Sequence, residues 1–486
     1  MEYMNLTVKR NLSMLMDFYE LTMSNGYFAN NMGDTIVYFD MFYRKNPDEA
    51  GFAIVAGLEQ VIQYIKDLNF TDEDINFLRN KKIFKEEFLD YLKTFKFTGD
   101  IYAIPEGTPI FPGEPLLTVK SKAIEAQLLE TMILLTINHQ SLIATKANRI
   151  VRAAKGRAVM EFGARRSQGY DGAVFGARAA YIGGVAGTAT TLADEAFGVP
   201  ALGTMAHSWV QMFESEFEAF KAYALIYPDG CTLLIDTYNV INSGVPNAIR
   251  VAKEVLAPMG YRLKGVRIDS GDIAYISKKC RRMLNEAGLI DCGIVASNSL
   301  DEYIITDLLD QGAKIDSFGV GERLITAKSE PVFGGVYKLV ALEIDGEIIP
   351  KIKISENAEK VTNPGYKKVW RLFDKKSDSA IADVITLAHE TIDETKPYII
   401  FDEVHTWKKK KVTKFVAKNL QVPIFLNGEC VYESPSLIDI REFCKSQVDN
   451  LWNESKRFTN PHKYYVDLSK ELWNCKQEMI NQYSFK

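Results

Sequence analysis

The chain has 486 residues, more than one ordinary core accommodates, so we expect two or three structural units. Hydrophobic residues make up 47% and charged residues 25%, which is typical of a soluble globular protein. The net charge of -5 gives no electrostatic reason to expect a nucleic acid or an anionic membrane as a partner.

The cysteines, the N-terminus and the longest apolar stretch all predict a soluble, cytoplasmic protein. The six cysteines include no C-x-x-C pair, as expected for reduced thiols. Residues 1–16 lack the apolar core of a signal peptide. The longest apolar stretch, 131–145, is interrupted by polar residues and is too short to span a bilayer.

The first part of the chain predicts an α+β domain over residues 1–130. Apolar residues at helical spacing predict a helix over 11–28, and the aromatic, β-branched segment after it predicts a strand. Residues 58–95 look helical, with Thr71 as an N-cap. Proline and glycine divide 99–119 into short strands. Residues 124–154 then predict a long helix.

From about residue 156, short apolar runs alternate with helix-like stretches. This alternation is typical of βαβ units and a parallel sheet, and it predicts an α/β catalytic domain over 131–344. An α/β barrel and an open doubly wound sheet would both produce the pattern, and periodicity alone does not separate them.

Polar or small residues follow four successive strands of this region. They are Asp236, the segment 269–272, the pair Ser297 and Asn298, and the pair Gly319 and Gly321. In a parallel barrel, the carboxyl ends of strands meet on the face that binds ligands. For any single loop, a simple turn is the better interpretation, but four such loops favour a phosphosugar site.

Strand-like segments lie at 336–344, 347–355 and 366–374, followed by the apolar run 383–392. Residues 345–400 are expected to complete the N-terminal domain. The lysines at 408–411 predict a solvated face. Residues 432–486 look helical, so 401–486 is predicted to be a C-terminal extension with helical character.

The densest candidate segment runs from Glu161 to Glu218. Arg165, Arg166 and Arg178 lie among small residues, and arginine forks match phosphate and carboxylate oxygens. His207 lies in GTMAHSW, where small neighbours leave its ring accessible, although a lone histidine is more often structural. A P-loop, a dinucleotide-binding G-x-G-x-x-G, an H-E-x-x-H and a G-x-S-x-G elbow are missing, and no histidines are paired at metal-ligand spacing.

Several motifs in order resemble the nicotinate phosphoribosyltransferase family. They are DFYELTMSNGYF, EFGARRSQGYDGA, GGVAGT, GTMAHS, VRIDSGD and FGVGERLIT followed by PVFGGVYKLV. The resemblance covers roughly residues 10–345. It implies an irregular α/β barrel beside an α+β N-terminal domain, in a homodimer with active sites at the subunit interface.

The resemblance also implies an activity. The chain would form nicotinate mononucleotide and diphosphate from nicotinate and 5-phosphoribosyl 1-diphosphate, for NAD biosynthesis and salvage. ATP would be a co-substrate, and Mg²⁺ a cofactor. His207 matches the histidine that ATP phosphorylates, so a phosphohistidine would couple the two reactions.

Binding roles follow from the same resemblance. Phe162 would stack on the pyridine ring, with Tyr19 of the partner subunit on the other face. Arg267 lies at the nicotinate end, and Asp269 would hold the ribose hydroxyls or assist Mg²⁺. The remaining substrate-binding positions, which include the cradle of the 5-phosphate and the phosphate-holding arginines, are Arg165, Arg166, Gly187, Thr188, Ser297, Asn298, Gly319 and Gly321.

Residue Ala189 favours the acid substrate. Nicotinamide enzymes carry an aspartate after the Gly-Thr of this turn, where it accepts the amide hydrogen bond, and they have Arg-Gly in place of Arg165-Arg166. A carboxylate at position 189 would repel nicotinate. The alternatives are a nicotinamide or quinolinate phosphoribosyltransferase and an inactive ligand-binding relative, whose motifs would be broken.

Overall fold

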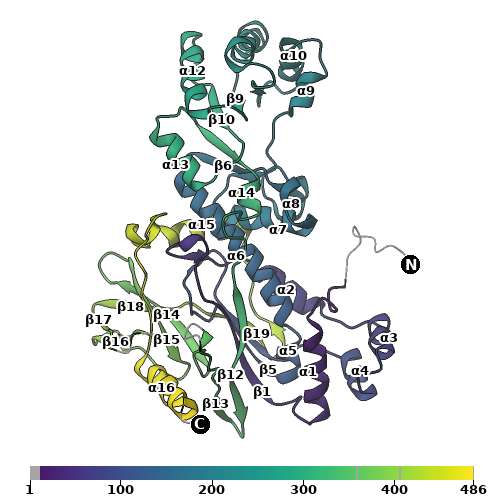
Figure 1. The fold of residues 1–486 in the computed structure, drawn as a ribbon, viewed down its shortest axis with the longest axis vertical. Helices are drawn as coiled ribbons and strands as arrows, with labels where there is room; N and C mark the ends of the chain where they lie inside the picture. The colour runs from purple at the N-terminus through teal and green to yellow at the C-terminus, as the bar shows by residue number, and fades with distance from the viewer. Residues whose placement is uncertain (1–10, 357–359, 404, 406, 485–486) are drawn as a thin grey trace. The chain divides into compact units, whose positions relative to one another are not determined.

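A computed structural model describes residues 11–356, 360–403, 405 and 407–484, and it divides into two compact units (Figure 1). The first unit takes its described residues from Met1–Ser141, Val332–Ser436 and Glu442–Lys486. The second takes them from Leu142–Pro331 and Leu437–Arg441. The second unit is therefore inserted into the sequence of the first.

These limits differ from the predicted boundaries at residues 130 and 344. Helix α6 (Glu130–Ala153) is continuous through residue 141, so no loop marks the first boundary. Strand β12 (Gly335–Ile344) pairs with β1 (Ile36–Tyr43) in antiparallel register and so belongs to the first unit.

The first unit combines largely antiparallel sheets with helices, and β15 and β21 form its one parallel pair among the described strands. Its other elements before the insertion are α1 (Phe18–Ala29), β2 (Ala53–Ile54), α2 (Leu58–Asp67), α3 (Asp72–Asn80), α4 (Glu86–Lys93), β3 (Asp100–Ala103), β4 (Pro109–Ile110), β5 (Leu117–Lys122) and α5 (Ala123–Gln127). Those after it are β13 (Glu347–Pro350), β14 (Lys367–Asp374), β15 (Ala380–Leu387), β16 (Tyr398–Phe401), β17 (Lys409–Val412), β18 (Phe415–Asn419), β19 (Val422–Leu426), β20 (Glu429–Cys430), β21 (Val466–Leu468) and α16 (Lys470–Ser484).

Two large sheets hold most of these strands, and β2 pairs with β4 in a separate two-stranded sheet. The seven-stranded sheet has the order β13-β12-β1-β5-β3-β19-β20, and the six-stranded sheet has the order β17-β16-β21-β15-β14-β18. Residues 401–486, predicted as an extension, thus contribute strands to both sheets as well as the helices α15 (Leu437–Asp449) and α16. The lysine-rich strand β17 lies at a sheet edge, where charged side chains discourage pairing with another chain.

Capping residues decide where the predicted helices begin. Thr71 caps α3 as predicted, because its hydroxyl accepts a hydrogen bond from the amide of Asp74 at 3.2 Å. The prediction of a helix from residue 11 was wrong at its start. Asp17 and Glu20 form a capping box, so α1 begins at Phe18.

A buried ion pair joins the late strands to the early part of the first unit. Arg371 on β14 makes a bidentate pair with Asp383 on β15 through its Nε and Nη2, and this Nη2 also donates to the carbonyl of Pro109 at 2.9 Å. Tyr464 donates to Asp383 at 2.9 Å. These buried polar groups fix segments distant in sequence against one another.

The second unit is built around a parallel sheet with the order β7-β6-β11-β10-β9-β8, curled into a half-barrel. The predicted βαβ alternation is confirmed, and the half-barrel is favoured over the doubly wound sheet. Its strands are β6 (Ala158–Glu161), β7 (Gly187–Thr188), β8 (Thr232–Leu234), β9 (Gly265–Ile268), β10 (Gly293–Ala296) and β11 (Ser317–Val320). Its helices are α7 (Gly169–Ile182), α8 (Thr191–Phe197), α9 (His207–Gln211), α10 (Glu216–Ile226), α11 (Val245–Val251), α12 (Ile273–Glu286), α13 (Glu302–Asp310) and α14 (Glu322–Ile325).

The core of the second unit explains why these strands are so apolar. Leu233, Val266 and Ile294 are fully buried on adjacent strands and pack with Phe220 and Val255 from the helices. A parallel sheet buried on both faces needs apolar residues at consecutive positions. The polar residues are therefore left to the strand ends. Among the described residues, no helix is long and apolar enough to cross a membrane.

Candidate active site

The carboxyl ends of the parallel strands hold most of the residues that the sequence singles out. Ile235 and Asp236 follow β8, Asp269 follows β9, and Ser297 follows β10. Because the strands are parallel neighbours, these residues meet at one edge of the sheet.

His207 lies at this edge, as the first residue of α9, with 40% of its side chain exposed. Its Nδ1 is 3.1 Å from the hydroxyl oxygen of Thr237. Its Nε2 is 4.0 Å from a carboxylate oxygen of Asp236 and 4.0 Å from one of Asp269. One ring nitrogen is therefore held by a hydroxyl group, while the other faces two acids.

Asp236 is the buried acid of this pair, with 1% of its side chain exposed. Its Oδ2 accepts hydrogen bonds from the Asp269 amide at 2.9 Å and the Ser270 hydroxyl at 2.6 Å. Its Oδ1 has no hydrogen-bond partner among the described residues. Asp269 is more exposed, at 38%, and accepts a short hydrogen bond from the Ser297 hydroxyl. The two acids thus differ: one orders the loop, and the other reaches solvent.

Arg267 supplies positive charge beside these acids. Its Nη1 donates to the hydroxyl of Thr204 at 2.7 Å, while its Nε is buried without a partner among the residues described. Burial lowers the pKa of Arg267, Asp269 and Asp236 raise it, and Arg165 lowers it. An arginine remains protonated at neutral pH, so Arg165 and Arg267 together form a cationic site suited to an anion.

The loop after β10 and the end of β11 carry residues with little conformational freedom. Asn298 has a φ of 109°, outside the conformations that side-chain-bearing residues prefer, and its carboxamide accepts a hydrogen bond from the Ser299 amide at 2.7 Å. A Cβ on Gly319 would lie 2.6 Å from the Phe162 ring, and one on Gly321 would lie 3.1 Å from the Phe162 carbonyl oxygen. A strained backbone conformation such as that of Asn298 is found most often at functional sites.

The turn that contains Gly187 and Thr188 is tied to the strand before Phe162. The Thr188 hydroxyl donates to the buried carboxylate of Glu161 at 2.6 Å. Ala189 is exposed at the end of this turn, and its amide donates to the Glu161 carbonyl at 2.8 Å. Phe162 continues from the same strand, and its amide donates to the Val320 carbonyl at 2.8 Å.

Two of the predicted residues are less closely joined to this group. Arg166 is exposed, and its charge lowers the pKa of Glu322 on α14, although Lys328 has the larger effect. Tyr19 belongs to the first unit, on α1, and 43% of it is exposed. Burial and the nearby carboxylate of Glu130 raise the pKa of its hydroxyl.

Sequence reasoning missed the residues that support this group. Asp236 was recognised only as a strand end, while Thr204, Thr237 and Glu161 received no role. Each is a common residue at a turn or strand end, so only its hydrogen-bond partner distinguishes it. Asp236 could have been predicted as a site residue, because polar residues at the ends of neighbouring parallel strands lie close together.

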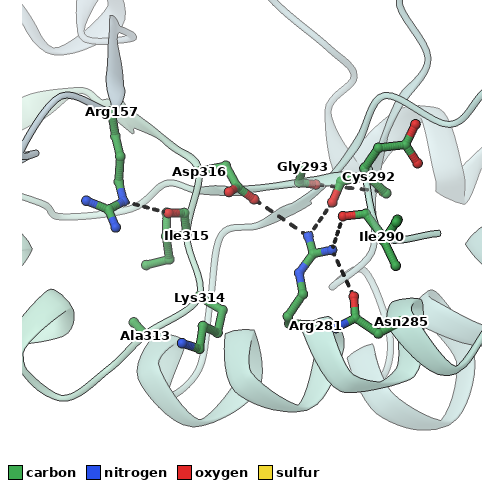
Figure 2. Close-up of a pocket in the computed structure, with 11 residues that line it drawn as sticks. Arg157, Arg281, Asn285, Ile290, Cys292, Gly293, Ala313, Lys314, Ile315 and Asp316 are labelled. Carbon is green, nitrogen blue, oxygen red and sulfur yellow. Dashed lines mark hydrogen bonds and ion pairs between the residues drawn. The ribbon is translucent and has the colours of Figure 1, made fainter. Parts of the chain in front are cut away.

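A hollow with a volume of about 580 Å³ lies at the opposite, amino-terminal ends of the parallel strands (Figure 2). Arg281 reaches into it and donates to the carbonyls of Ile290 and Cys292, with Asp316 at 3.6 Å. Arg157 donates to the carbonyl of Ile315 at 2.8 Å on the other side. These arginines are used to hold loops together, which is the stabilising role expected at the amino ends of barrel strands.

Comparisons with known proteins agree along most of the chain. Sequence models of the nicotinate phosphoribosyltransferase (NAPRTase) N-terminal domain, family and C-terminal domain match residues 14–138, 157–381 and 366–476. The last match covers much of the tail, in which the sequence analysis found no motif. The nicotinate phosphoribosyltransferase of Bacillus subtilis is 43% identical over 473 residues, which cover 97% of this chain and 96% of that protein.

Solved structures give the same assignment. The human nicotinic acid phosphoribosyltransferase superposes with a TM-score of 0.85 at 28% identity, covering 96% of this chain and 99% of that one. A nicotinate-nucleotide pyrophosphorylase of Pyrococcus furiosus, 24% identical with a TM-score of 0.71, covers 92% of this chain and 99% of its own, and it supports the fold alone. From its motifs, its half-barrel and these relatives, we conclude that the chain belongs to the nicotinate phosphoribosyltransferase family.

Proposed function

We propose that this protein transfers the phosphoribosyl group of 5-phosphoribosyl 1-diphosphate to nicotinate, forming nicotinate mononucleotide and diphosphate for NAD biosynthesis and salvage. The observation that carries the proposal is the arrangement of His207, Asp236, Asp269 and Arg267 at adjoining strand ends. It contains an accessible imidazole, two acids and a cation in one place. Family membership gives the substrates.

The residues suit a displacement at the anomeric carbon. The pyridine nitrogen attacks this carbon, the bond to the diphosphate oxygen breaks, and the electron pair leaves with diphosphate. Arg165 and Arg267 would stabilise the charge that grows on the leaving group. The exposed carboxylate of Asp269 would face the ribose, where positive charge develops. No protein base is needed, because the pyridine nitrogen is itself the nucleophile.

We propose further that ATP phosphorylates His207. A ring nitrogen attacks the γ-phosphorus, the bond to the ADP oxygen breaks, and water later hydrolyses the phosphohistidine. The contact between Nδ1 and Thr237 supports attack by Nε2, which lies near Asp236 and Asp269. Those carboxylates would stabilise the positive charge on the substituted ring, as an acid does beside a catalytic histidine.

Magnesium fits this arrangement as a cofactor. Asp269 is accessible, and the Oδ1 of Asp236 has no hydrogen-bond partner among the described residues. Mg²⁺ usually takes one or two carboxylates together with substrate phosphates, so a protein cage is unnecessary. When bound, the ion would neutralise charge on the diphosphate.

The turn at 187–189 supports nicotinate over nicotinamide. Ala189 is exposed, so an aspartate could be accommodated there without clashing with the core. This chain carries no such carboxylate and retains Arg165 and Arg166, a combination that favours an anionic substrate.

We also propose a cytoplasmic homodimer in which Tyr19 of one subunit completes the site of the other. Leu15, Phe18, Tyr19 and Met23 are all exposed large side chains around α1, between 39% and 49%. Such a cluster is typical of a surface that a partner covers. A second copy of the chain would bury it.

The test is a synthesis assay on the whole chain. Purified protein is incubated with 5-phosphoribosyl 1-diphosphate, Mg²⁺ and either nicotinate or nicotinamide, with and without ATP, and mononucleotide is quantified. We expect product from nicotinate, a higher rate with ATP, and loss of the ATP effect in His207→Ala. His389→Ala is the matched control, because His389 is exposed in the first unit and pairs with Glu471.

Each alternative gives a different result. Product from nicotinamide alone would retain the fold and overturn the substrate assignment. No product from either base would favour a binding protein without catalysis. An ATP effect that survives in His207→Ala would overturn the phosphohistidine.

A further inference from the structure

Glu161 is a buried acid at the centre of the candidate pyridine-binding region. It is the last residue of β6, directly before Phe162, and none of it is exposed to solvent. Strand β6 pairs with β7 on one side and β11 on the other, so Glu161 stands between Thr188 and Val320 in the sheet register. It therefore lies between three loops of the site.

Both carboxylate oxygens of Glu161 are used. One accepts a short hydrogen bond from the Gly163 amide, and the other accepts the Thr188 hydroxyl at 2.6 Å. Thr188 in turn accepts the Thr190 amide at 3.0 Å through the same hydroxyl. The backbone carbonyl of Glu161 also accepts the Ala189 amide. Glu161 thus fixes the chain on both sides of Phe162 and of the 187–190 turn.

No cation balances this acid within the part of the chain that the structure describes. Burial raises the pKa of Glu161, and the hydrogen bonds from Thr188 and Gly163 lower it. A buried acid without an ion pair is costly, and an apolar residue would fill a strand end more cheaply. We therefore attribute the presence of Glu161 to the groups that its carboxylate holds in place.

We infer that Glu161 is a positioning residue for the pyridine subsite: its two hydrogen bonds set the separation between the Phe162 ring and the Gly187–Ala189 turn. This inference rests on the proposed function, because it presumes that nicotinate binds between these elements. Glu161 does not touch the ring in this scheme. It acts through Thr188 and Gly163.

If Glu161 only positions the pyridine subsite, its loss should change the KM for nicotinate and not the KM for the phosphoribosyl donor. The Phe162 ring is packed against Gly319, so its place depends on the chain direction at Gly163. Loss of the carboxylate releases the ring and the turn, which hold nicotinate. It leaves in place the strand ends at 267–269 and 297–298, which would hold the phosphoribosyl donor. The KM for nicotinate should therefore rise while the KM for the donor changes little.

The experiment compares wild type with Glu161→Ala and Glu161→Gln. Loss of hydrogen bonds to a charged group is expected to raise the nicotinate KM about ten-fold or more in Glu161→Ala, with the donor KM within about two-fold of wild type. Glutamine keeps one acceptor for Gly163 and places its amide at Thr188, so most of the loss should be recovered. Glu286→Ala, an exposed acid at the end of α12, is the control.

A second pair of variants tests the same hydrogen bond in case Glu161→Ala does not fold. Thr188→Val removes the hydroxyl donor at similar volume, and Thr188→Ser keeps it. We expect a raised nicotinate KM in the valine variant and a nearly normal one in the serine variant. Melting temperatures of all variants show whether general destabilisation accompanies the change.

The outcomes separate the two proposals. Wild-type protein that makes no mononucleotide from nicotinate overturns the proposed function. Active wild type with an unchanged nicotinate KM in both Glu161→Ala and Thr188→Val overturns the positioning role. So does an equal rise in both KM values, because that would indicate a general structural role.

Discussion

At the scale of single residues, the carboxylate of Asp236 connects the histidine to the loop after β9. It accepts the amide of Asp269 and the hydroxyl of Ser270 and lies 4.0 Å from His207. A change of charge at this position alters the imidazole environment and the loop together. Its effect on catalysis should therefore exceed its effect on stability.

We predict that Asp236→Asn lowers the ATP-stimulated rate by about 10- to 100-fold, since about 2 kcal/mol of charged hydrogen bonding is weakened. Incorporation of labelled γ-phosphate into the protein measures the step directly. Asp307→Asn, an exposed position on α13, serves as the control. Normal labelling of the Asp236→Asn protein would contradict the role given to this acid.

A second residue makes stability depend on pH. Burial raises the pKa of Glu20 to about 7, although hydrogen bonds from Thr131 and Asp17 oppose the shift. The folded chain then binds this proton more tightly than the unfolded chain. The stability that it contributes is full below the unfolded pKa of about 4.5 and is lost as the pH rises through about 7.

Glu20→Gln should remove this dependence, because glutamine stays neutral and keeps an acceptor oxygen. Relative to wild type, the variant should gain on the order of 2 kcal/mol in unfolding free energy between pH 5 and pH 8. Thermal unfolding followed at several pH values measures the difference. A constant gap between the two proteins would show that Glu20 is ionised throughout.

Residue roles could be predicted only in part. Asp269 and Ser297 meet because they follow neighbouring strands. His207 begins α9 and lies 4.0 Å from Asp269, a contact that strand spacing does not predict. Glu161 could not be selected, because its importance depends on a hydroxyl that lies 27 positions away in the sequence. Spacing along one chain does not encode such a contact.

At the scale of elements, strand β11 approaches the loop after β6 so closely that only glycine fits at 319. A Cβ there would lie 2.6 Å from one ring carbon of Phe162 and 2.7 Å from another. An alanine at position 319 would therefore force the Phe162 ring to move, because the backbone of its loop is constrained.

We expect Gly319→Ala to raise the KM for nicotinate at least about five-fold, since overpacking of this kind costs about 1–3 kcal/mol. Steady-state kinetics with nicotinate varied would measure this. Gly230→Ala is the matched control, because nothing lies within 4 Å of a Cβ there. Unaltered kinetics in Gly319→Ala would mean that Phe162 does not contact the substrate.

Short periodic segments were the most predictable elements. Strand β1 and the β9–β11 region match their predictions, because alternation or continuous apolarity marks a strand locally. The pairing of β1 with β12 was not predictable, since about 300 residues separate them and either strand could join another edge. Strand β17 was missed because lysines dominate it, and β18, β19 and β21 were missed because each has only three to five residues, too few for a clear periodic pattern.

At the scale of the whole molecule, the proposed sharing of sites between subunits has a quantitative consequence. Tyr19 and His207 would then act in the same site but come from different copies of the chain. Two variants that each lack the ATP-stimulated activity should regain it when their subunits exchange.

Mixing Tyr19→Ala with His207→Ala after mild dissociation and reassembly should recover about a quarter of the wild-type ATP-stimulated activity, because half of the random dimers are mixed and each has one intact site. Unmixed samples taken through the same dissociation are the controls. Recovery should follow the ratio of the two proteins. If no activity returns although mixed dimers form, each site is made by one chain.

The division into two units could also be predicted only in part from the sequence. The change of rhythm near residue 156 indicates the parallel sheet, yet helix α6 hides the boundary at 141. A continuous helix gives no composition shift. Glycine and proline mark loops, and there is no loop at that point.

The inserted arrangement of the units affects how the protein is made in the cell. Strand β1 pairs with β5 on one edge, but its other partner, β12, lies beyond the whole inserted unit. At ~5–20 residues per second, a ribosome takes on the order of ten to forty seconds to translate the chain between residues 122 and 335. During that time the nascent chain carries an open strand edge, which other chains can join. A coding sequence that stops after the inserted unit would leave this edge open permanently, so such a truncation should yield aggregates and not a shorter enzyme.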